Sequence, residues 1–326
     1  MQTQTNTQNG IGPETKGVFV KRRREGQVVI ATLDNPPYGL VTAELLDELN
    51  TFVDEVERDE SIGAVVFHGA HPTRFLGHFD VFELLEMVEG SSIKVSQRQA
   101  DIALRTVRAI AHVPGASRAI ERSTAAGLLA IERYHDLLLR INRIGATFIA
   151  AMNGSAMGGG LELALACDLR YIADGDHYLS PPEILIGIIP GLGGTQRIAR
   201  AMGTAPALEL ILEGGMLSPH QALAAGLVNR VVEPDRLLDE ALTTARRLAR
   251  RPRAAVAAAK RAVYEGTSTT LARGMHVEQA AFMAALSGPA AARGVKAYVE
   301  DVKRTGDLTA FDPHARKAYT DVPTST

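Results

Sequence analysis

The most informative stretch of the sequence is AMNGSAMGGGLELALACD, residues 151–168. It follows a β-branched and aromatic run at 147–150 that predicts a strand, and Asn153-Gly154 predicts a turn. Three glycines at 158–160 then open an Ala- and Leu-rich run typical of a helix. Because glycine has no Cβ, a ligand can approach this backbone closely, and the unpaired N–H groups of a helix start point toward it. The stretch therefore predicts an anion or oxyanion site.

Glu162 lies two residues after these glycines, inside an otherwise apolar run. A carboxylate buried there is costly without a partner or a chemical task, whereas the alternative is a Glu on a solvated helix face. The phosphate-binding patterns G-x-x-x-x-G-K-[ST] and G-x-G-x-x-G do not occur at this strand–helix junction. No G-x-S-x-G is present either, which makes Ser155 a poor nucleophile candidate.

A second motif, PPEILIGIIPGLGGTQR, occupies residues 181–197. Together the two stretches resemble the crotonase family of enoyl-CoA hydratases and isomerases. The glycines, the acid, the Cys-Asp pair, the Pro-Glu pair and the Pro-Gly-x-Gly-Gly-Thr-Gln-Arg run occur in the family's order, and weaker likeness extends from 35–37 to the C-terminal helices. The resemblance implies an α/β fold, a crotonase-type spiral of β-β-α turns with a helical C-terminal region.

The same resemblance implies a set of site residues. Glu162 and Glu183 match the two carboxylates that hold and deprotonate water and exchange a proton at the α-carbon. The N–H groups of His78 and Gly159 match the oxyanion-hole donors that stabilise the enolate of an acyl thioester. Further substrate or coenzyme A contacts are implied at Gly39, Leu40, Leu76, Asp80, Gly158, Pro182 and Gly191.

No cofactor beyond the coenzyme A thioester, which is the substrate, is implied. His68, His71, His78 and Asp80 could be taken for metal ligands, but their spacing fits no compact zinc pattern, and we expect no metal.

The presence of both carboxylates favours an enoyl-CoA hydratase-like enzyme, since one acid must take a proton while another gives one. An enoyl-CoA isomerase is the nearest alternative, followed by a crotonase-type enzyme that cleaves C–C bonds or hydrolyses thioesters. A different class is a non-catalytic RNA-binding homologue that uses the basic run 21–24. The competing interpretation is that this basic run forms the charged edge of a strand.

The loop 74–80 departs from the family's pattern, because His78 stands where a small residue is usual and Phe79 intervenes before Asp80. A helical insert at about 90–143 follows, with apolar stripes on two helices separated by Pro114-Gly115. The insert is either an extra hairpin that adds packing or subunit contact, or a lid that shapes the acyl pocket. We expect a larger or branched acyl thioester to be preferred over the crotonyl thioester, with the His78 ring lining the pocket or acting directly in catalysis.

The chain divides into a disordered N-terminal tail at 1–16, the spiral core at 17–252, a C-terminal helical region at 253–311 and a tail at 312–326. By resemblance, the C-terminal helices mediate self-association as a trimer or hexamer. A net charge of -2 argues against nucleic-acid and membrane partners. The single cysteine, Cys167, fits a reducing cytoplasm.

Overall fold

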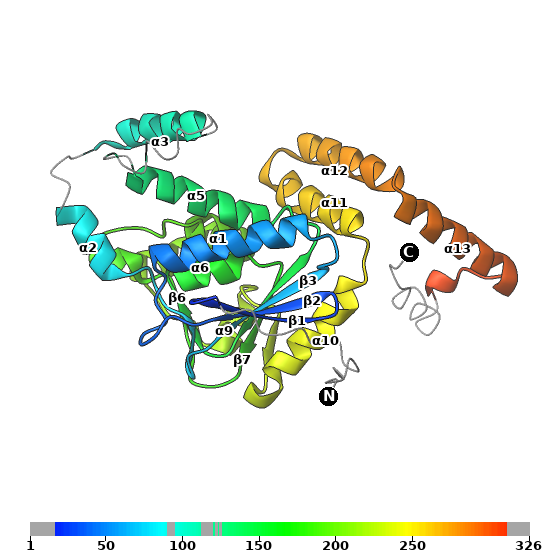
Figure 1. Ribbon diagram of the computed structural model, residues 1–326, viewed down its shortest axis with the longest axis horizontal. Coiled ribbons are helices and arrows are strands. Elements are labelled where there is room, and N and C mark those ends of the chain that lie inside the picture. The colour runs from blue at the N-terminus through cyan, green and yellow to red at the C-terminus, as the bar shows by residue number, and fades with distance from the viewer. Residues whose placement is uncertain (1–16, 90–94, 112–119, 121–122, 124–125, 312–326) are drawn as a thin grey trace, which may run out of the picture.

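Strands that alternate between two sheets build the core of the molecule (Figure 1). The computed structural model describes residues 17–89, 95–111, 120, 123 and 126–311. Within them, the larger sheet contains β1 (Val20–Glu25), β2 (Val28–Leu33), β3 (Ala64–Gly69), β5 (Thr147–Met152), β7 (Leu169–Ala173) and β9 (Arg230–Val232), in that order. The smaller sheet contains β4 (Arg74–Leu76), β6 (Ser155–Met157) and β8 (Leu179–Ser180).

Three successive turns of the chain follow one plan. The first strand of each pair, β3, β5 or β7, enters the larger sheet, and the next strand, β4, β6 or β8, enters the smaller one. Strands from successive turns pair in parallel, with Val65 opposite Phe148 and Ala151 opposite Tyr171. This is the predicted spiral, so the fold class is confirmed. At the sheet edge, β1 and β2 form an antiparallel hairpin around Gly26.

Helices cover both faces of the larger sheet. The helices in the described part of the chain are α1 (Ala43–Arg58), α2 (Val81–Glu89), α3 (Gln97–Ala111), α5 (Ala126–Ile141), α6 (Gly159–Ala166), α7 (Gly194–Met202), α8 (Thr204–Glu213), α9 (Pro219–Ala224), α10 (Leu237–Ala249), α11 (Arg253–Tyr264), α12 (Leu271–Leu286) and α13 (Pro289–Thr305). Short 3₁₀ turns are η1 (Pro182–Ile186), η2 (Pro234–Arg236), η3 (Gly266–Ser268) and η4 (Thr309–Phe311). The starts of α1 and α9 have side-chain caps: Thr42 accepts a hydrogen bond from the Leu45 N–H, and Ser218 forms a capping box with Gln221.

The alternation of side chains along each strand creates two apolar cores. Val65, Phe67 and Phe148 face the helices α1, α5 and α6, whereas Val66 and Ile149 face α10. Figure 1 shows α1 and α5 on one side of the sheet and α10 on the other. Helix α6 is buried along its whole length, which fits its nearly uniform Ala and Leu composition.

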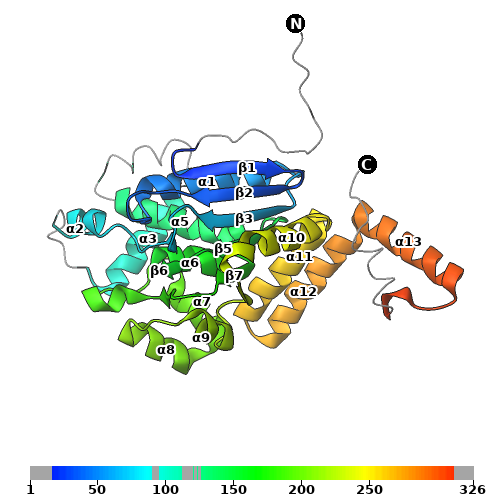
Figure 2. The ribbon, with the colours of Figure 1, turned by 90° about the horizontal axis from the view of Figure 1, so that it is seen from below.

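The C-terminal helices leave the core progressively, and α13 lies farthest from the sheets in Figure 2. One of their attachment points is a buried ion pair between Lys260 of α11 and Asp168, whose nitrogen and oxygen are 2.8 Å apart. Lys260 also donates to the carbonyl oxygens of Ile141 and Ala146, and Tyr264 donates to Asp168. These bonds tie α11 directly to the end of α5 and to the strand that leads into the site.

The basic run on β1 is paired with acids. Its four side chains form ion pairs, Lys21 with Asp34, Arg22 with Glu55, Arg23 with Glu25 and Arg24 with Asp59. Such pairing on an edge strand favours the interpretation as a charged sheet edge over a contact with RNA phosphates. Among the described helices, none is long and apolar enough to cross a membrane.

The two described helices of the insert, α3 and α5, are buried to different extents. Helix α5 is packed into the core through Leu137, Leu138 and Ile141, while the stripe expected on α3 buries Val107 and leaves Ile102 more than half exposed. Helix α2, which precedes the insert, was not predicted as a separate element. The expected break at Pro114-Gly115, and the two expected tails at 1–16 and 312–326, lie outside the described residues.

Candidate active site

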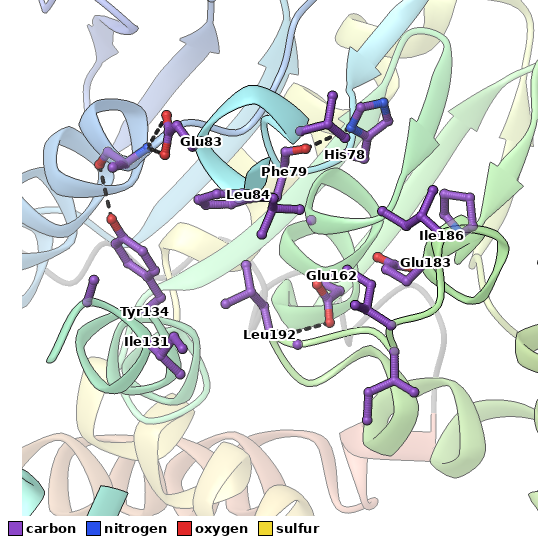
Figure 3. Close-up of a pocket in the computed structure, with 18 of the residues that line it drawn as sticks. His78, Phe79, Glu83, Leu84, Ile131, Tyr134, Glu162, Glu183, Ile186 and Leu192 are labelled. Atoms are coloured by element: carbon purple, nitrogen blue, oxygen red, sulfur yellow. Dashed lines mark hydrogen bonds between the residues drawn. The ribbon is translucent and has the colours of Figure 1, made fainter. Parts of the chain in front are cut away.

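A cavity of about 430 Å³ lies where α2, α5, η1 and the start of α6 meet (Figure 3). Pockets of this size are typical of small-molecule sites. Its wall contains Ala43, His78, Phe79, Val81, Glu83, Leu84, Gly127, Ala130, Ile131, Tyr134, Gly159, Glu162, Pro182, Glu183, Leu185, Ile186, Ile188, Ile189, Gly191 and Leu192. The structure therefore brings both predicted carboxylates and both predicted oxyanion-hole residues to one cavity.

Two backbone donors in this wall are available to a ligand. Among the described residues, neither the His78 N–H nor the Gly159 N–H has a hydrogen-bond acceptor. Gly159 is the first residue of α6, whose N-terminal end carries partial positive charge. His78 follows β4 in the adjacent loop. A pair of free N–H groups from two segments is the arrangement that an oxyanion hole requires.

The loop and the helix start are held together by close backbone contacts. The Gly160 N–H donates to the Gly77 carbonyl at 2.9 Å, and a Cβ on Gly160 would lie 2.2 Å from the Leu76 oxygen. Gly158 has a φ of 51°, and a Cβ there would lie 2.8 Å from the His78 Cβ. The glycines at 158 and 160 are thus required by conformation and approach. At Gly159 a Cβ would meet the Val41 side chain at 3.2 Å, so the space there is less restricted.

Glu162 is buried, and one of its oxygens is fully engaged. Oε1 accepts hydrogen bonds from the N–H groups of Leu192 and Gly194, both at 2.7 Å. The pKa of Glu162 is raised to about 7, mainly by burial and also by the nearby Glu183 carboxylate, while the two N–H donors and Arg197 oppose the change. The side chain can therefore exist in both protonation states near neutral pH.

Glu183 projects from η1 into the same cavity, and Figure 3 shows it beside Glu162. Burial raises its pKa, with its own backbone and His78 opposing the change. Its Oε2 is buried without a hydrogen-bond partner in the described part of the chain. An unpartnered buried oxygen is costly, which is typical of a group whose partner is a substrate.

The His78 ring has a hydrogen bond of its own. Nδ1 lies 2.8 Å from the Phe79 carbonyl oxygen (Figure 3), and because a carbonyl only accepts, Nδ1 must carry the proton. The bond fixes the orientation of the ring at the cavity wall. This favours the interpretation of His78 as pocket lining.

Most residues of the cavity wall were not predicted from the sequence to belong to the active site. The apolar residues come from α2, α5 and the segment 185–192, and Ile131 of α5 had been interpreted only as part of a helix stripe. Glu83 accepts from the Ala43 N–H, and Tyr134 donates to the Ala43 carbonyl, so both anchor the start of α1. The sequence signal for this wall is the apolar run that contains Ile186, Ile188 and Ile189, and these side chains are exposed in the structure.

The other implied substrate contacts divide into two groups. Pro182 and Gly191 line the cavity, and Gly158 lies directly behind His78 and Glu183. The other four, Gly39, Leu40, Leu76 and Asp80, lie outside the wall. The Gly39 carbonyl accepts from the Gly77 N–H, and Leu40 packs beside Gly77. Leu76 is buried in β4, and Asp80 caps α2 by accepting from the Phe82 N–H. They support the His78 loop, and a contact with coenzyme A remains a prediction for them.

The histidines before this loop have structural contacts. His68 on β3 is near the Ala151 carbonyl at 3.2 Å, and burial lowers its pKa, while His71 accepts from the Thr73 N–H. The described residues contain no group of three or more His, Cys, Asp or Glu that could hold a metal ion.

Known proteins resemble this chain in both sequence and fold. The family model described as enoyl-CoA hydratase/isomerase matches residues 118–306. A probable enoyl-CoA hydratase of Rhizobium meliloti is 33% identical over 84% of this chain and 92% of its own length. The short-chain-enoyl-CoA hydratase of Clostridium acetobutylicum is 29% identical over 87% and 95%, respectively. The crystal structure of an enoyl-CoA hydratase from Bacillus anthracis superposes with a TM-score of 0.69 at 26% identity, over 87% of this chain and 96% of that one.

Proposed function

We propose a mechanism for this chain, which belongs to the enoyl-CoA hydratase/isomerase family. It is an enoyl-CoA hydratase-like enzyme, and its two carboxylates add water across the α,β double bond of an acyl-CoA thioester. The observation that supports this most directly is the convergence of Glu162, Glu183 and two unpaired N–H groups on one cavity. The coenzyme A thioester is the substrate, and the mechanism requires no further cofactor.

The chemistry follows from charge. As water adds to the β-carbon, the thioester carbonyl gains enolate character, and the N–H groups of His78 and Gly159 stabilise the developing negative charge. Losing one such donor costs about 3 kcal/mol in known oxyanion holes. Burial and the nearby Glu183 carboxylate raise the pKa of Glu162 to about 7, so this side chain can give or take a proton near neutral pH. One member then takes a proton from water while the other delivers one to the α-carbon.

Glu162→Gln and Glu183→Gln should each lower kcat for hydration by about two to four orders of magnitude, because each removes a proton-transfer group and keeps the side-chain volume. The loss of conjugated-thioester absorbance measures the rate, and circular dichroism checks the fold. Glu209→Gln, an exposed acid on α8, is the matched control and should keep full activity. Full activity in either site variant would exclude that acid from the mechanism.

The isomerase alternative uses the same oxyanion hole and the same cavity. It requires a proton to leave one carbon and return to another, with no water added, and a single acid can do this. The second carboxylate, Glu183, has a buried oxygen without a partner, and this favours hydration, in which two acids are used.

The cavity supports a larger acyl group than crotonyl. Apart from Glu162, Glu183, Glu83, His78 and Tyr134, the residues of its wall are apolar. Leu84 of α2 and Ile131 of α5 lie opposite Ile186 of η1 (Figure 3). Helix α5 of the insert therefore shapes the pocket, as the lid interpretation expects. We infer a preference for longer or branched enoyl thioesters.

Ile131→Trp should fill this part of the cavity and lower kcat/KM more for long-chain enoyl thioesters than for the crotonyl thioester. Leu139→Trp changes an exposed position on the same helix and is the matched control. A panel of enoyl-CoA thioesters of graded length provides the measurement. An equal effect on every chain length would contradict the assignment of Ile131 to the acyl pocket.

We also propose self-association as a trimer or hexamer. Helices α12 and α13 carry exposed apolar side chains, among them Phe282 at 60% and Val295 at 55%, and a second subunit would bury them. Light scattering should report three or six chains, and a monomer at micromolar concentration would contradict the proposal. A cytoplasmic location, suggested by the single cysteine, is part of the same proposal.

A further inference from the structure

One hydrogen bond connects the insert to the loop that holds the catalytic acid. His135 of α5 lies with its Nε2 2.7 Å from the carbonyl oxygen of Gly191. The acceptor is a carbonyl, so Nε2 must carry the proton and donate it. The next residue, Leu192, donates its N–H to Glu162 Oε1 at 2.7 Å. The His135 ring and the Glu162 carboxylate therefore bind one and the same peptide group, between Gly191 and Leu192.

The two bonds hold opposite sides of that peptide. In a trans peptide the C=O and the N–H point in opposite directions, so fixing the carbonyl fixes the direction of the N–H. Hydrogen bonds in series also polarise one another, which strengthens the bond from Leu192 to Glu162.

The Leu192 side chain packs against the core, but the Gly191 side of the peptide has no side-chain anchor. Gly191 has no side chain, and a Cβ built there would meet nothing within 4 Å. The loop has glycines with positive φ on both sides, Gly187 at 81° and Gly193 at 100°. If the peptide rotated, the Gly191 carbonyl oxygen would turn toward the Glu162 carboxylate, and a donor would be replaced by a repelling acceptor.

We propose that His135 is a positioning residue, which orients the Gly191–Leu192 peptide so that its N–H holds Glu162 in the reactive geometry. This inference rests on the proposed function of Glu162 as one of the two catalytic acids. It also gives the insert a second role beside lining the acyl pocket, because α5 orients the peptide that holds Glu162.

The effect on Glu162 has a definite sign. An N–H donor stabilises the carboxylate, so losing the Leu192 bond raises the pKa of Glu162 above its value of about 7. The other groups that act on this carboxylate are the Gly194 N–H, Glu183 and Arg197, and a change at His135 leaves all three in place.

The test compares His135→Ala with His135→Gln, whose side-chain N–H can replace the imidazole Nε2–H. Asp136→Ala, an exposed neighbour on α5, is the matched control. His135→Ala should lower kcat about three- to tenfold, the equivalent of one hydrogen bond, with KM largely unchanged. The ¹³C resonance of the Glu162 carboxyl, assigned by its loss in Glu162→Gln, should titrate at higher pH in His135→Ala. His135→Gln should restore both properties, and Asp136→Ala should change neither.

Three results decide the matter. If His135→Ala changes neither kcat nor the Glu162 titration, whatever its melting temperature, the bond is only structural and the proposal is wrong. The proposal is equally wrong if both properties change but His135→Gln restores neither. The carboxyl titration needs no substrate, so a shifted titration in a protein that does not hydrate enoyl thioesters would uphold the role of His135 and reject the proposed function.

Discussion

Glu162 carries a cost in stability that follows from its place in the site. Its pKa is raised from 4.5 to about 7 in the folded protein, mainly by burial. Between these two values the folded state binds more protons than the unfolded state, so the free energy of unfolding falls as the pH rises through this range. With 1.36 kcal/mol for each pKa unit, the loss amounts to about 3 kcal/mol above neutral pH.

Glu162→Gln should therefore stabilise the fold above neutral pH by up to about 3 kcal/mol while it lowers activity, because the neutral amide keeps the shape without the buried charge. Below pH 4.5, where the wild-type acid is protonated in both states, the two proteins should unfold at similar denaturant concentrations. Urea unfolding across this range provides the measurement. A variant that is less stable than the wild type above neutral pH would contradict this view of the site.

At the level of single residues, the cavity residues that the sequence predicted all belong to a family motif or to the loop 74–80. Glu162, Glu183, His78 and Gly159 all line the cavity as predicted, although their catalytic roles remain proposals. His135 could not be predicted, since its partner Gly191 is far along the chain and the contact depends on how α5 docks. No local pattern distinguishes a histidine that binds a distant carbonyl from one that faces solvent.

Helix α11 is attached to the core by a buried cluster around Lys260 and, at its first turn, by Arg253, which donates to the carbonyl oxygens of Val56, Asp59 and Ile62. Lys260 is 8% exposed and donates to Asp168 and to two carbonyl oxygens, while its Nζ lies 5.1 Å from the centre of the Phe148 ring. Burial lowers the pKa of Lys260 and raises that of Asp168, and their pairing opposes both changes. Removing one partner would leave the other charge buried and uncompensated.

Lys260→Met should lower the free energy of unfolding by about 3–5 kcal/mol, the usual cost of breaking a buried ion pair. The double variant Lys260→Met with Asp168→Asn should recover part of this loss, because it removes the uncompensated carboxylate as well. Chemical denaturation of both variants measures the difference. A loss below about 1 kcal/mol in the single variant, as for an exposed pair, would show that the cluster does not anchor α11.

At the level of elements, the strand and helix around residues 147–168, the spiral and the helical C-terminal region were predicted from the sequence and are present. The separate helix α2 and the partial exposure of α3 were not predicted. An apolar stripe shows that a helix has a face to bury, but the stripe does not reveal how much of that face finds a partner. The partner is chosen by the docking of distant elements.

At the level of the whole molecule, the family's motifs determine the spiral, and the chain differs from the motifs' pattern mainly at the acyl side of the cavity. Strand pairs in two sheets bring the His78 loop, the α6 start and η1 together, although these segments are far apart in the sequence. The shape and depth of the pocket came from α2 and α5, whose positions no motif specifies.

The central claim is that water is added to the substrate, and the product identifies the reaction directly. The wild-type protein is incubated with a 2-enoyl-CoA thioester of medium chain length in ¹⁸O-labelled water, and the thioester product is analysed by mass spectrometry. The mechanism predicts a product that is heavier than the substrate by one molecule of labelled water, with the label on the β-hydroxyl group and the thioester intact. A product of unchanged mass with a shifted double bond, or release of free coenzyme A, would contradict it.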